Sequence, residues 1–132
     1  MDKLRLAGCI ILKNNSILLL HRISKDWYEL PGGKIDEKET AQEAAIREIK
    51  EELGCNVTIV RELGNFDFEQ DGHTLNYTWF IGKLESGESP WNVEEETFDH
   101  FAFIPLAALS KHSLSTNMKN FVRLLEAKQI VL

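Results

Sequence analysis

The sequence is poor in cysteine, has no long apolar run and carries a deficit of positive charge. Its two cysteines, Cys9 and Cys55, are too few for a disulfide framework, and such usage is typical of a reducing cytoplasm. The apolar stretch near the N-terminus is only about seven residues long, ends at Lys13 and lacks a cleavage-like site, so we interpret it as a strand rather than a signal peptide. No run is long enough to span a membrane. The net charge of −6 argues against nucleic acid or an anionic membrane surface as a partner.

Length and composition predict one domain over residues 1–132. Apolar residues make up 43% of the chain and charged residues 27%, as in ordinary globular proteins. We find no repeat, linker or low-complexity tract. Hydrophobic periodicity and turn residues predict strands at 4–12, 17–22, 57–63, 74–84 and 100–104, and helices at 41–53 and 117–128. This mixture predicts an α/β sandwich.

The most informative pattern spans Gly33 to Cys55. It places a glycine loop before a helix that is rich in carboxylates. The residues that define it are Gly33, Glu39, Arg47, Glu48, Glu51, Glu52, Leu53, Gly54 and Cys55.

Local signals delimit the helix within this pattern. Thr40 followed three residues later by Glu43 is a capping box, which starts a helix near Ala41. Gly54 is the residue type expected just past a helix end. The apolar residues between these limits recur at helical spacing, so one face of the helix is expected to pack inward.

Three glutamates of this helix share a neighbouring face. Glu48, Glu51 and Glu52 stand at positions i, i+3 and i+4, where like charges destabilise an isolated helix by a few tenths of a kcal/mol per pair. A solvated acidic face is the simpler interpretation of such a run taken alone. Glu52, however, borders the buried arc, and the paired glycines of Leu30–Lys34 allow main-chain groups to approach a metal or phosphate. A divalent cation would relieve the repulsion, and Mg²⁺ prefers carboxylate oxygens and substrate phosphates.

The Gly33–Cys55 pattern resembles the signature box of the Nudix hydrolases, which cleave a nucleoside diphosphate linked to another moiety. Every fixed position matches except the last, where Cys55 replaces a larger aliphatic residue. The resemblance implies the Nudix fold, in which a mixed β-sheet is sandwiched between α-helices. It also implies that Gly33, through its carbonyl, and Glu48, Glu51 and Glu52 hold Mg²⁺, with Mn²⁺ as a substitute. Arg47 is expected to pair with a box glutamate and orient it, and Glu39 to anchor the loop to the helix.

Outside the box, the chain is most similar to the MutT-like branch, and four positions carry this likeness. Arg22 ends the second predicted strand, where such enzymes place a phosphate-binding arginine, although a surface arginine is the alternative. Lys34 is a second candidate for phosphate, or simply a solvated lysine. Glu94 occupies a loop where similar enzymes carry another catalytic carboxylate, although Glu95 and Glu96 leave a plain acidic loop equally open. Asn117 either reads a purine edge or caps the last helix.

The remaining aromatic and histidine residues are interpreted mainly as structural. Trp79 lies in an alternating strand and is expected in the core, whereas Trp27 and Trp91 lie in loops and are the better candidates for a wall beside a nucleobase. The four histidines show no metal-ligand spacing along the chain, so none is expected to be a ligand.

Together these features predict a Mg²⁺-dependent enzyme that cleaves nucleoside triphosphates to a monophosphate and pyrophosphate. Glu48 or a carboxylate of the loop 94–96 is expected to act as general base. A pyrophosphatase for ADP-ribose or another nucleoside diphosphate derivative is the alternative, and a nucleotide-sensing module without activity is a third. The expected partner is a small nucleotide, and the protein is a monomer or a homodimer.

Overall fold

The computed structural model describes residues 3–91 and 93–132. Strands dominate it, and two α-helices and one 3₁₀ helix, η1, complete it. In chain order the elements are β1 (Lys3–Lys13), β2 (Ser16–Arg22), β3 (Trp27–Glu29), β4 (Gly32–Lys34), α1 (Ala41–Leu53), β5 (Val57–Gln70), β6 (His73–Leu84), β7 (Phe98–Pro105), η1 (Leu106–Lys111) and α2 (Thr116–Glu126).

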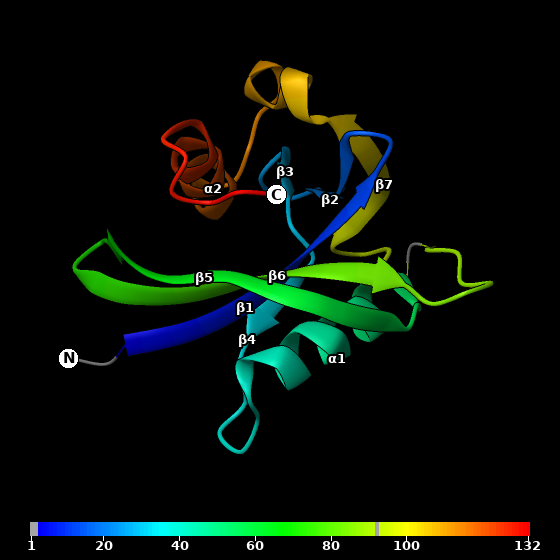
Figure 1. Cartoon of the computed structure of the whole chain (residues 1–132), viewed down its shortest axis with the longest axis horizontal. Helices are drawn as coiled ribbons and strands as arrows, with labels where there is room; N and C mark the ends of the chain where they lie inside the picture. Colours follow the sequence, from blue (N-terminus) through cyan, green and yellow to red (C-terminus); the bar gives the residue numbers. More distant parts are fainter. Residues whose placement is uncertain (1–2, 92) are drawn as a thin grey trace.

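The strands form a mixed sheet whose long central members are β1 and β6 (Figure 1). β1 and β6 run parallel, with Lys3 opposite Thr74 and Ile11 opposite Gly82. β5 and β4 are antiparallel to their neighbours β6 and β1. The end of β1 turns into β2, which pairs with β3 on one side and β7 on the other. β1 therefore belongs to both halves of the structure and connects them.

Helices cover opposite faces of the central strands, with α1 below the sheet and α2 and η1 above it in Figure 1. Successive residues of a strand point to opposite faces, so adjacent residues of β6 enter different layers. Trp79 is fully buried in a core with Met118 and Phe121 of α2. Phe80 packs with Ala44 and Ala45 of α1. This arrangement is the helix–sheet–helix sandwich that the sequence predicted, with Trp79 in the core as expected.

The structure extends several predicted elements. The strand predicted at 57–63 continues to Gln70, and its register against β6 shifts at bulges between Ile59 and Arg61 and between Glu62 and Gly64. A bulge resets the alternation of inward and outward side chains, so the period-two pattern of the sequence ends before the strand does. The short strands β3 and β4 were not predicted. The last helix begins at Thr116 and ends at Glu126, close to the predicted 117–128.

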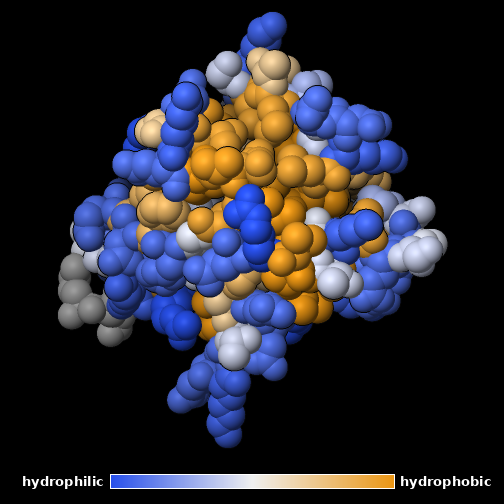
Figure 2. Space-filling view, in the orientation of Figure 1, coloured by the Kyte–Doolittle hydropathy of each residue, from blue (hydrophilic) through white to orange (hydrophobic). Residues whose placement is uncertain are grey.

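Apolar side chains gather in the middle of the face shown in Figure 2. A shallow groove lies among residues of β1, β5, β6 and β7, including Leu12, Val60, Ile81, Leu84 and Phe103. Val60 is 58% exposed there.

No helix among the described residues has both the length and the apolar content that a membrane span requires.

Candidate active site

Helix α1 is fixed at both ends by the residues that the sequence indicated. The Thr40 side chain accepts a hydrogen bond from the Glu43 backbone N–H at 3.1 Å, and Glu43 accepts one from the Thr40 N–H at 2.9 Å. Gly54 adopts a left-handed conformation with φ of 66°, and its N–H donates to the Lys50 carbonyl. This closure is favourable for glycine and strained for other residues. The capping box and the glycine stop are therefore confirmed.

Glu52 is a buried carboxylate beside the paired glycines. Only 5% of it is exposed, and its Oε1 accepts a hydrogen bond from the Gly32 N–H at 2.9 Å. Burial raises the pKa of Glu52 well above its usual range, the charge of Glu48 adds to this effect, and the Gly32 hydrogen bond opposes it. A charged Glu52 therefore needs a further positive group close by.

Glu48 lies directly against Gly33. A Cβ placed on Gly33 would come within 2.6 Å of Glu48 Oε1, and one on Gly32 would clash with the Ala7 carbonyl oxygen. The glycine pair thus lets the β4 backbone approach both β1 and the helix carboxylates. Burial raises the pKa of Glu48, and the charge of Arg47 opposes this shift.

Arg47 ties the glutamates of the box together. Its Nε and Nη2 donate to Glu39 at 2.7 and 3.0 Å, and its Nη1 lies 3.1 Å from oxygens of both Glu48 and Glu51. Nη2 also donates to the Lys34 carbonyl at 3.0 Å. The Arg47 hydrogen bonds lower the pKa of Glu39 to about 2. The pairing expected for Arg47 is confirmed, and Glu39 joins the loop to the helix as predicted.

Glu51 differs in position from the other two helix carboxylates. Its side chain is 49% exposed and bonded to Arg47, whereas Glu48 and Glu52 turn toward the glycines. The face expected from the i, i+3, i+4 spacing is thus split, with two carboxylates turned inward and one at the solvent edge. A ligand at the glycines would meet Glu48 and Glu52 before Glu51.

A cavity of about 270 Å³ opens beside this cluster. It brings together residues from β2, the paired glycines and the start of α2, which are far apart in the sequence. The residues that matter for the site are Arg22, Trp27, Glu29, Gly32, Gly33 and Asn117. The cavity therefore joins the glycine loop to two of the sequence-predicted substrate residues.

Arg22 is held at the cavity by a carboxylate that sequence reasoning missed. Glu29 accepts hydrogen bonds from Arg22 Nε at 2.6 Å and from Nη2 at 2.9 Å. The Trp27 indole N–H donates to the same carboxylate at 2.8 Å, and the Arg22 guanidinium lies 5.0 Å from the centre of the Phe98 ring. Glu29 reaches Arg22 because β3 pairs with β2. The sequence did not predict β3, so it gave no indication of this contact. Trp27 lies in β3 rather than in the predicted loop, and because it lines the cavity it stays a candidate for the wall beside a nucleobase.

The acidic loop 93–97 lies beside the C-terminal end of α1. The Trp91 N–H donates to the Leu53 carbonyl at 3.0 Å, and the Val93 N–H donates to the Glu52 carbonyl at 3.3 Å. The charge of Glu94 contributes to the raised pKa values of both Glu48 and Glu52. Glu94 is thus placed near the carboxylates. Trp91 lies over Gly54 and does not line the cavity.

Of the predicted substrate residues Lys34 and Asn117, only Asn117 lines the cavity. Lys34 is exposed and is not among the residues that line the cavity, although its backbone carbonyl accepts from Arg47. Asn117 lines the cavity, and its Oδ1 is buried without a hydrogen-bond partner among the described residues. The helix-cap interpretation of Asn117 is wrong, because Ser115 is the N-cap and accepts from the Met118 N–H at 3.1 Å. The hydroxyl of Ser115 stands one position before the helix begins, where it can reach that N–H.

Residues 3–125 match the family model of the NUDIX domain. The chain belongs to the Nudix hydrolase family. It is 31% identical over 114 residues to the 8-oxo-dGTP diphosphatase of Escherichia coli, which covers 82% of this chain and 87% of that protein. It is 36% identical over 100 residues to the ADP-ribose pyrophosphatase of Methanocaldococcus jannaschii, which covers 68% of this chain and 58% of the relative. The crystal structure of a MutT Nudix hydrolase from Burkholderia pseudomallei superposes with a TM-score of 0.82 at 26% identity, covering 93% of this chain and 98% of that one.

The carboxylate and carbonyl oxygens around the paired glycines are ligands of the kind that a hard divalent cation prefers. Nudix enzymes generally use divalent metal ions, and such ions prefer carboxylate and carbonyl oxygens. Here, Glu48 and the buried Glu52 meet at the glycine backbone, and burial together with the charge of Glu48 raises the pKa of Glu52, so a cation at this point would stabilise its charged form. Arg47 is hydrogen-bonded to Glu39, Glu48 and Glu51, whereas the Glu52 side chain accepts from the Gly32 backbone. The residues present therefore fit the cation.

Proposed function

We propose that this Nudix hydrolase cleaves nucleoside triphosphates to a nucleoside monophosphate and pyrophosphate, with Mg²⁺ as cofactor and Mn²⁺ as a substitute. The observation that carries the proposal is the single cavity that joins Arg22, Gly33 and Asn117 beside Glu48 and Glu52. Such a cavity provides a place for a phosphate chain at one end and a base at the other. The E. coli relative at 31% identity, an 8-oxo-dGTP diphosphatase, supports the same substrate class.

The cation would be held by Glu48, Glu51, Glu52 and the Gly33 carbonyl. When bound, it supplies charge neutralisation at the phosphate oxygens and lowers the pKa of a water molecule. Arg47 restrains Glu48 and Glu51 through its planar guanidinium. Glu51 has to turn from Arg47 toward the glycines to share the ion.

Proton removal from the attacking water is assigned to Glu48 or to the loop carboxylates at 94–96. Burial raises the pKa of Glu48, and a base whose pKa approaches the working pH accepts a proton most effectively. Glu94 lies close enough to affect the pKa values of Glu48 and Glu52, which keeps it as the second candidate.

Arg22 is the cation best placed for the phosphate chain. The protein has a net charge of −6, which would repel a polyphosphate unless a local cation attracts it. Glu29 fixes the Arg22 guanidinium through two hydrogen bonds, so a cation that lines the cavity is held in a defined orientation. Lys34 is exposed, so we assign it a secondary role at the cavity entrance.

Cleavage of ADP-ribose or a related nucleoside diphosphate derivative is the second candidate. The observation that favours it is the 36% identity to the ADP-ribose pyrophosphatase of M. jannaschii. The acidic box is equally suited to either anhydride, so the base pocket and the groups around the leaving phosphate decide between them. A module without activity is disfavoured, because all the box carboxylates are present.

Product analysis in oxygen-18 water tests the proposal. Each nucleoside triphosphate is incubated with Mg²⁺, and pyrophosphate is measured separately from phosphate. We expect monophosphate and pyrophosphate in equal amounts, with the position of the label identifying the attacked phosphorus. Rapid turnover of ADP-ribose with negligible triphosphate cleavage would establish the second candidate instead.

A further inference from the structure

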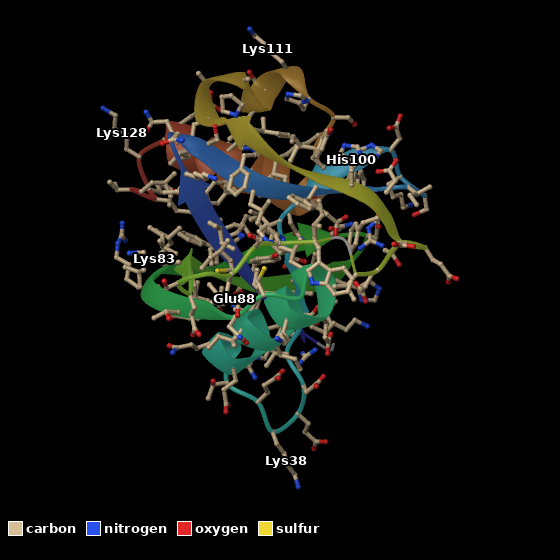
Figure 3. The ribbon with its side chains drawn as sticks, turned by 90° about the vertical axis from the view of Figure 1, so that its right-hand side faces the viewer. Lys38, Lys83, Glu88, His100, Lys111 and Lys128 are labelled. Carbon is tan, nitrogen blue, oxygen red and sulfur yellow. The ribbon has the colours of Figure 1, made fainter. Side chains whose placement is uncertain are left out.

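A cluster of two histidines and one aspartate lies outside the cavity of the Nudix site. His21 of β2 stands opposite His100 of β7 in the strand register, and their rings stack with centroids 4.8 Å apart. Asp99 Oδ1 lies 2.8 Å from His21 Nδ1 and 2.7 Å from His100 Nδ1. In Figure 3, His100 lies on β7, well above helix α1. None of the three residues lines the cavity beside the box glutamates.

The outer nitrogen of each ring already has an oxygen partner. His21 Nε2 lies 2.9 Å from Asp26 Oδ1, and His100 Nε2 lies 2.8 Å from the Tyr28 hydroxyl. Histidines that bind metals commonly donate their second ring N–H to a carboxylate or another oxygen, which fixes the tautomer and the ring orientation. Both rings therefore direct Nδ1 toward the same aspartate oxygen while their far sides are anchored.

We propose that His21 Nδ1, Asp99 Oδ1 and His100 Nδ1 bind a divalent transition-metal ion, with Zn²⁺ as the best match and water completing the coordination. These atoms all lie within 4.8 Å of one another. Two imidazole nitrogens and one carboxylate oxygen form a donor set that suits Zn²⁺, whereas the all-oxygen donors of the box suit Mg²⁺. The two sites thus select different ions.

The cluster has to rearrange to accept the ion. Bonds of about 2.0–2.1 Å in a tetrahedral site place ligand atoms roughly 3.3 Å apart, so the two contacts of Asp99 must lengthen by about 0.5 Å. The ligand atoms of the two histidines, which lie within 4.8 Å of each other, must approach by up to about 1.5 Å. The Asp99 side chain is 49% exposed and contacts both histidines, so it has room to move. In the metal-free protein a proton must occupy each short N–O contact, and the ion replaces these protons on binding.

Binding would clamp β2 to β7 at a defined point. The pairing of these strands changes register between His21 and Arg22, so the metal would bridge them immediately before this irregularity. An ion that binds only the folded protein raises its melting temperature in proportion to the logarithm of its concentration. We therefore expect Zn²⁺ to raise the melting temperature while leaving the requirement for Mg²⁺ in catalysis unchanged.

Zinc titration in the presence of saturating Mg²⁺ tests the proposal on the full chain. Wild-type protein is expected to bind one Zn²⁺ per chain by calorimetry and to melt at a higher temperature. His100→Ala and Asp99→Asn should weaken Zn²⁺ binding at least about tenfold and remove the thermal shift, as expected when a ligand is lost. His73→Ala is the matched control, because His73 is exposed at the start of β6 and lies outside the cluster. It should bind Zn²⁺ like the wild type.

Two further measurements keep the outcome decisive. Glu52→Gln should retain Zn²⁺ binding, so loss of zinc in this variant would place the ion at the box and overturn the proposal without bearing on nucleotide hydrolysis. Co²⁺ added to the wild type should give the strong visible absorption of a tetrahedral site, which does not depend on any variant folding. Absence of that absorption, or unchanged zinc affinity in His100→Ala, would equally overturn the proposal.

Discussion

Glu52 has a carboxyl group at a buried position, where the charged form of that group is unfavourable. It is 5% exposed, and its side chain accepts a hydrogen bond from the Gly32 N–H. A buried carboxylate without a full set of partners destabilises the fold unless it is protonated or meets a cation. We interpret its position as a consequence of the site, since binding of a metal ion removes the penalty.

Replacing Glu52 by glutamine is expected to separate catalysis from folding. Glu52→Gln should lower kcat by roughly two or more orders of magnitude, because a metal ligand contributes several kcal/mol to the transition state. A carboxyl group whose pKa is higher in the folded protein costs stability above its unfolded value of about 4.3, so at pH 7 without metal the variant should melt no lower than the wild type.

Steady-state kinetics with Mg²⁺ and a thermal melt in chelator measure the two effects of this substitution. Glu43→Gln on the exposed first turn of α1 is not suitable as a control, since Glu43 belongs to the capping box. Glu62→Gln in the exposed part of β5 is the better comparison and should retain full activity. Full wild-type activity in excess chelator would contradict the assigned role of the carboxylates.

Asn117 is the residue on which base recognition depends. Its Oδ1 is buried at the cavity without a partner, so a donor on the base would satisfy it, and the amide can pair with a purine edge through a donor and an acceptor. Asn117→Ala should weaken purine nucleotides by about 1–3 kcal/mol in kcat/KM, the scale of one bidentate pair, and leave pyrimidine nucleotides nearly unchanged.

Ser115 provides the control for Asn117. As the N-cap of α2, its replacement in Ser115→Ala should cost about 1 kcal/mol of stability and leave the ratio of purine to pyrimidine kcat/KM as in the wild type. The measurements are the melting temperature and that ratio for both variants. If the ratio of purine to pyrimidine kcat/KM is unaltered in Asn117→Ala, Asn117 does not recognise the base.

At the scale of elements, α1 carries the carboxylates and its N-terminus determines how firmly they are held. The capping box of Thr40 and Glu43 satisfies backbone donors at the start of the helix. Arg47 then joins the helix to Glu39 and to the Lys34 carbonyl, so the loop and the helix form one unit. The site is thus supported by contacts made before and within the helix.

Removing the cap should weaken this element without changing its chemistry. Thr40→Ala is expected to reduce the free energy of unfolding by about 1 kcal/mol, because the Glu43 N–H loses its acceptor. Thr40→Ser keeps a hydroxyl and should remain close to the wild type. Urea unfolding measures the change, and kcat at saturating Mg²⁺ should stay within about twofold for both variants. A large fall in kcat for Thr40→Ala would show that the cap also positions the carboxylates.

The sequence predicts some helices and strands well and misses others, because a sequence pattern reports only on residues that are close together in the chain. Both α-helices and the strands with regular alternation were found, because their periodicity is written in consecutive residues. The second half of β5 was missed where bulges interrupt the alternation, and the short strands β3 and β4 carry too few residues to show a period. Glu29 lies on β3, so its contact with Arg22 was missed together with the strand.

At the scale of the whole molecule, β1 organises the site. It pairs in parallel with β6, with β4 through the paired glycines, and with β2 at its end. Gly32 approaches the Ala7 carbonyl so closely that no side chain fits between them. The acidic helix, the phosphate-binding candidate on β2 and the start of α2 are therefore placed around one strand, which explains why residues from distant parts of the chain share a cavity.

The same long-range pairing accounts for the histidine cluster. Spacing along the chain led us to expect that no histidine is a metal ligand, since His21 and His100 show no pattern that links them. Their proximity follows from the antiparallel register of β2 and β7, and a shift of one residue would turn either side chain to the opposite face. Sequence spacing is informative about ligands on one helix and silent about ligands on strands that pair at a distance.

The sequence by itself determined the family, the α/β sandwich, the limits of α1 and the gathering of carboxylates on that helix. Each of these depends on helical geometry and capping, which act over about four residues. Only the tertiary structure decided that Glu52 is buried against Gly32, that Glu29 holds Arg22, and that Asn117 faces the cavity while Ser115 caps α2. These contacts depend on strand register and on which surface covers each side chain, and both are fixed by residues far away along the chain.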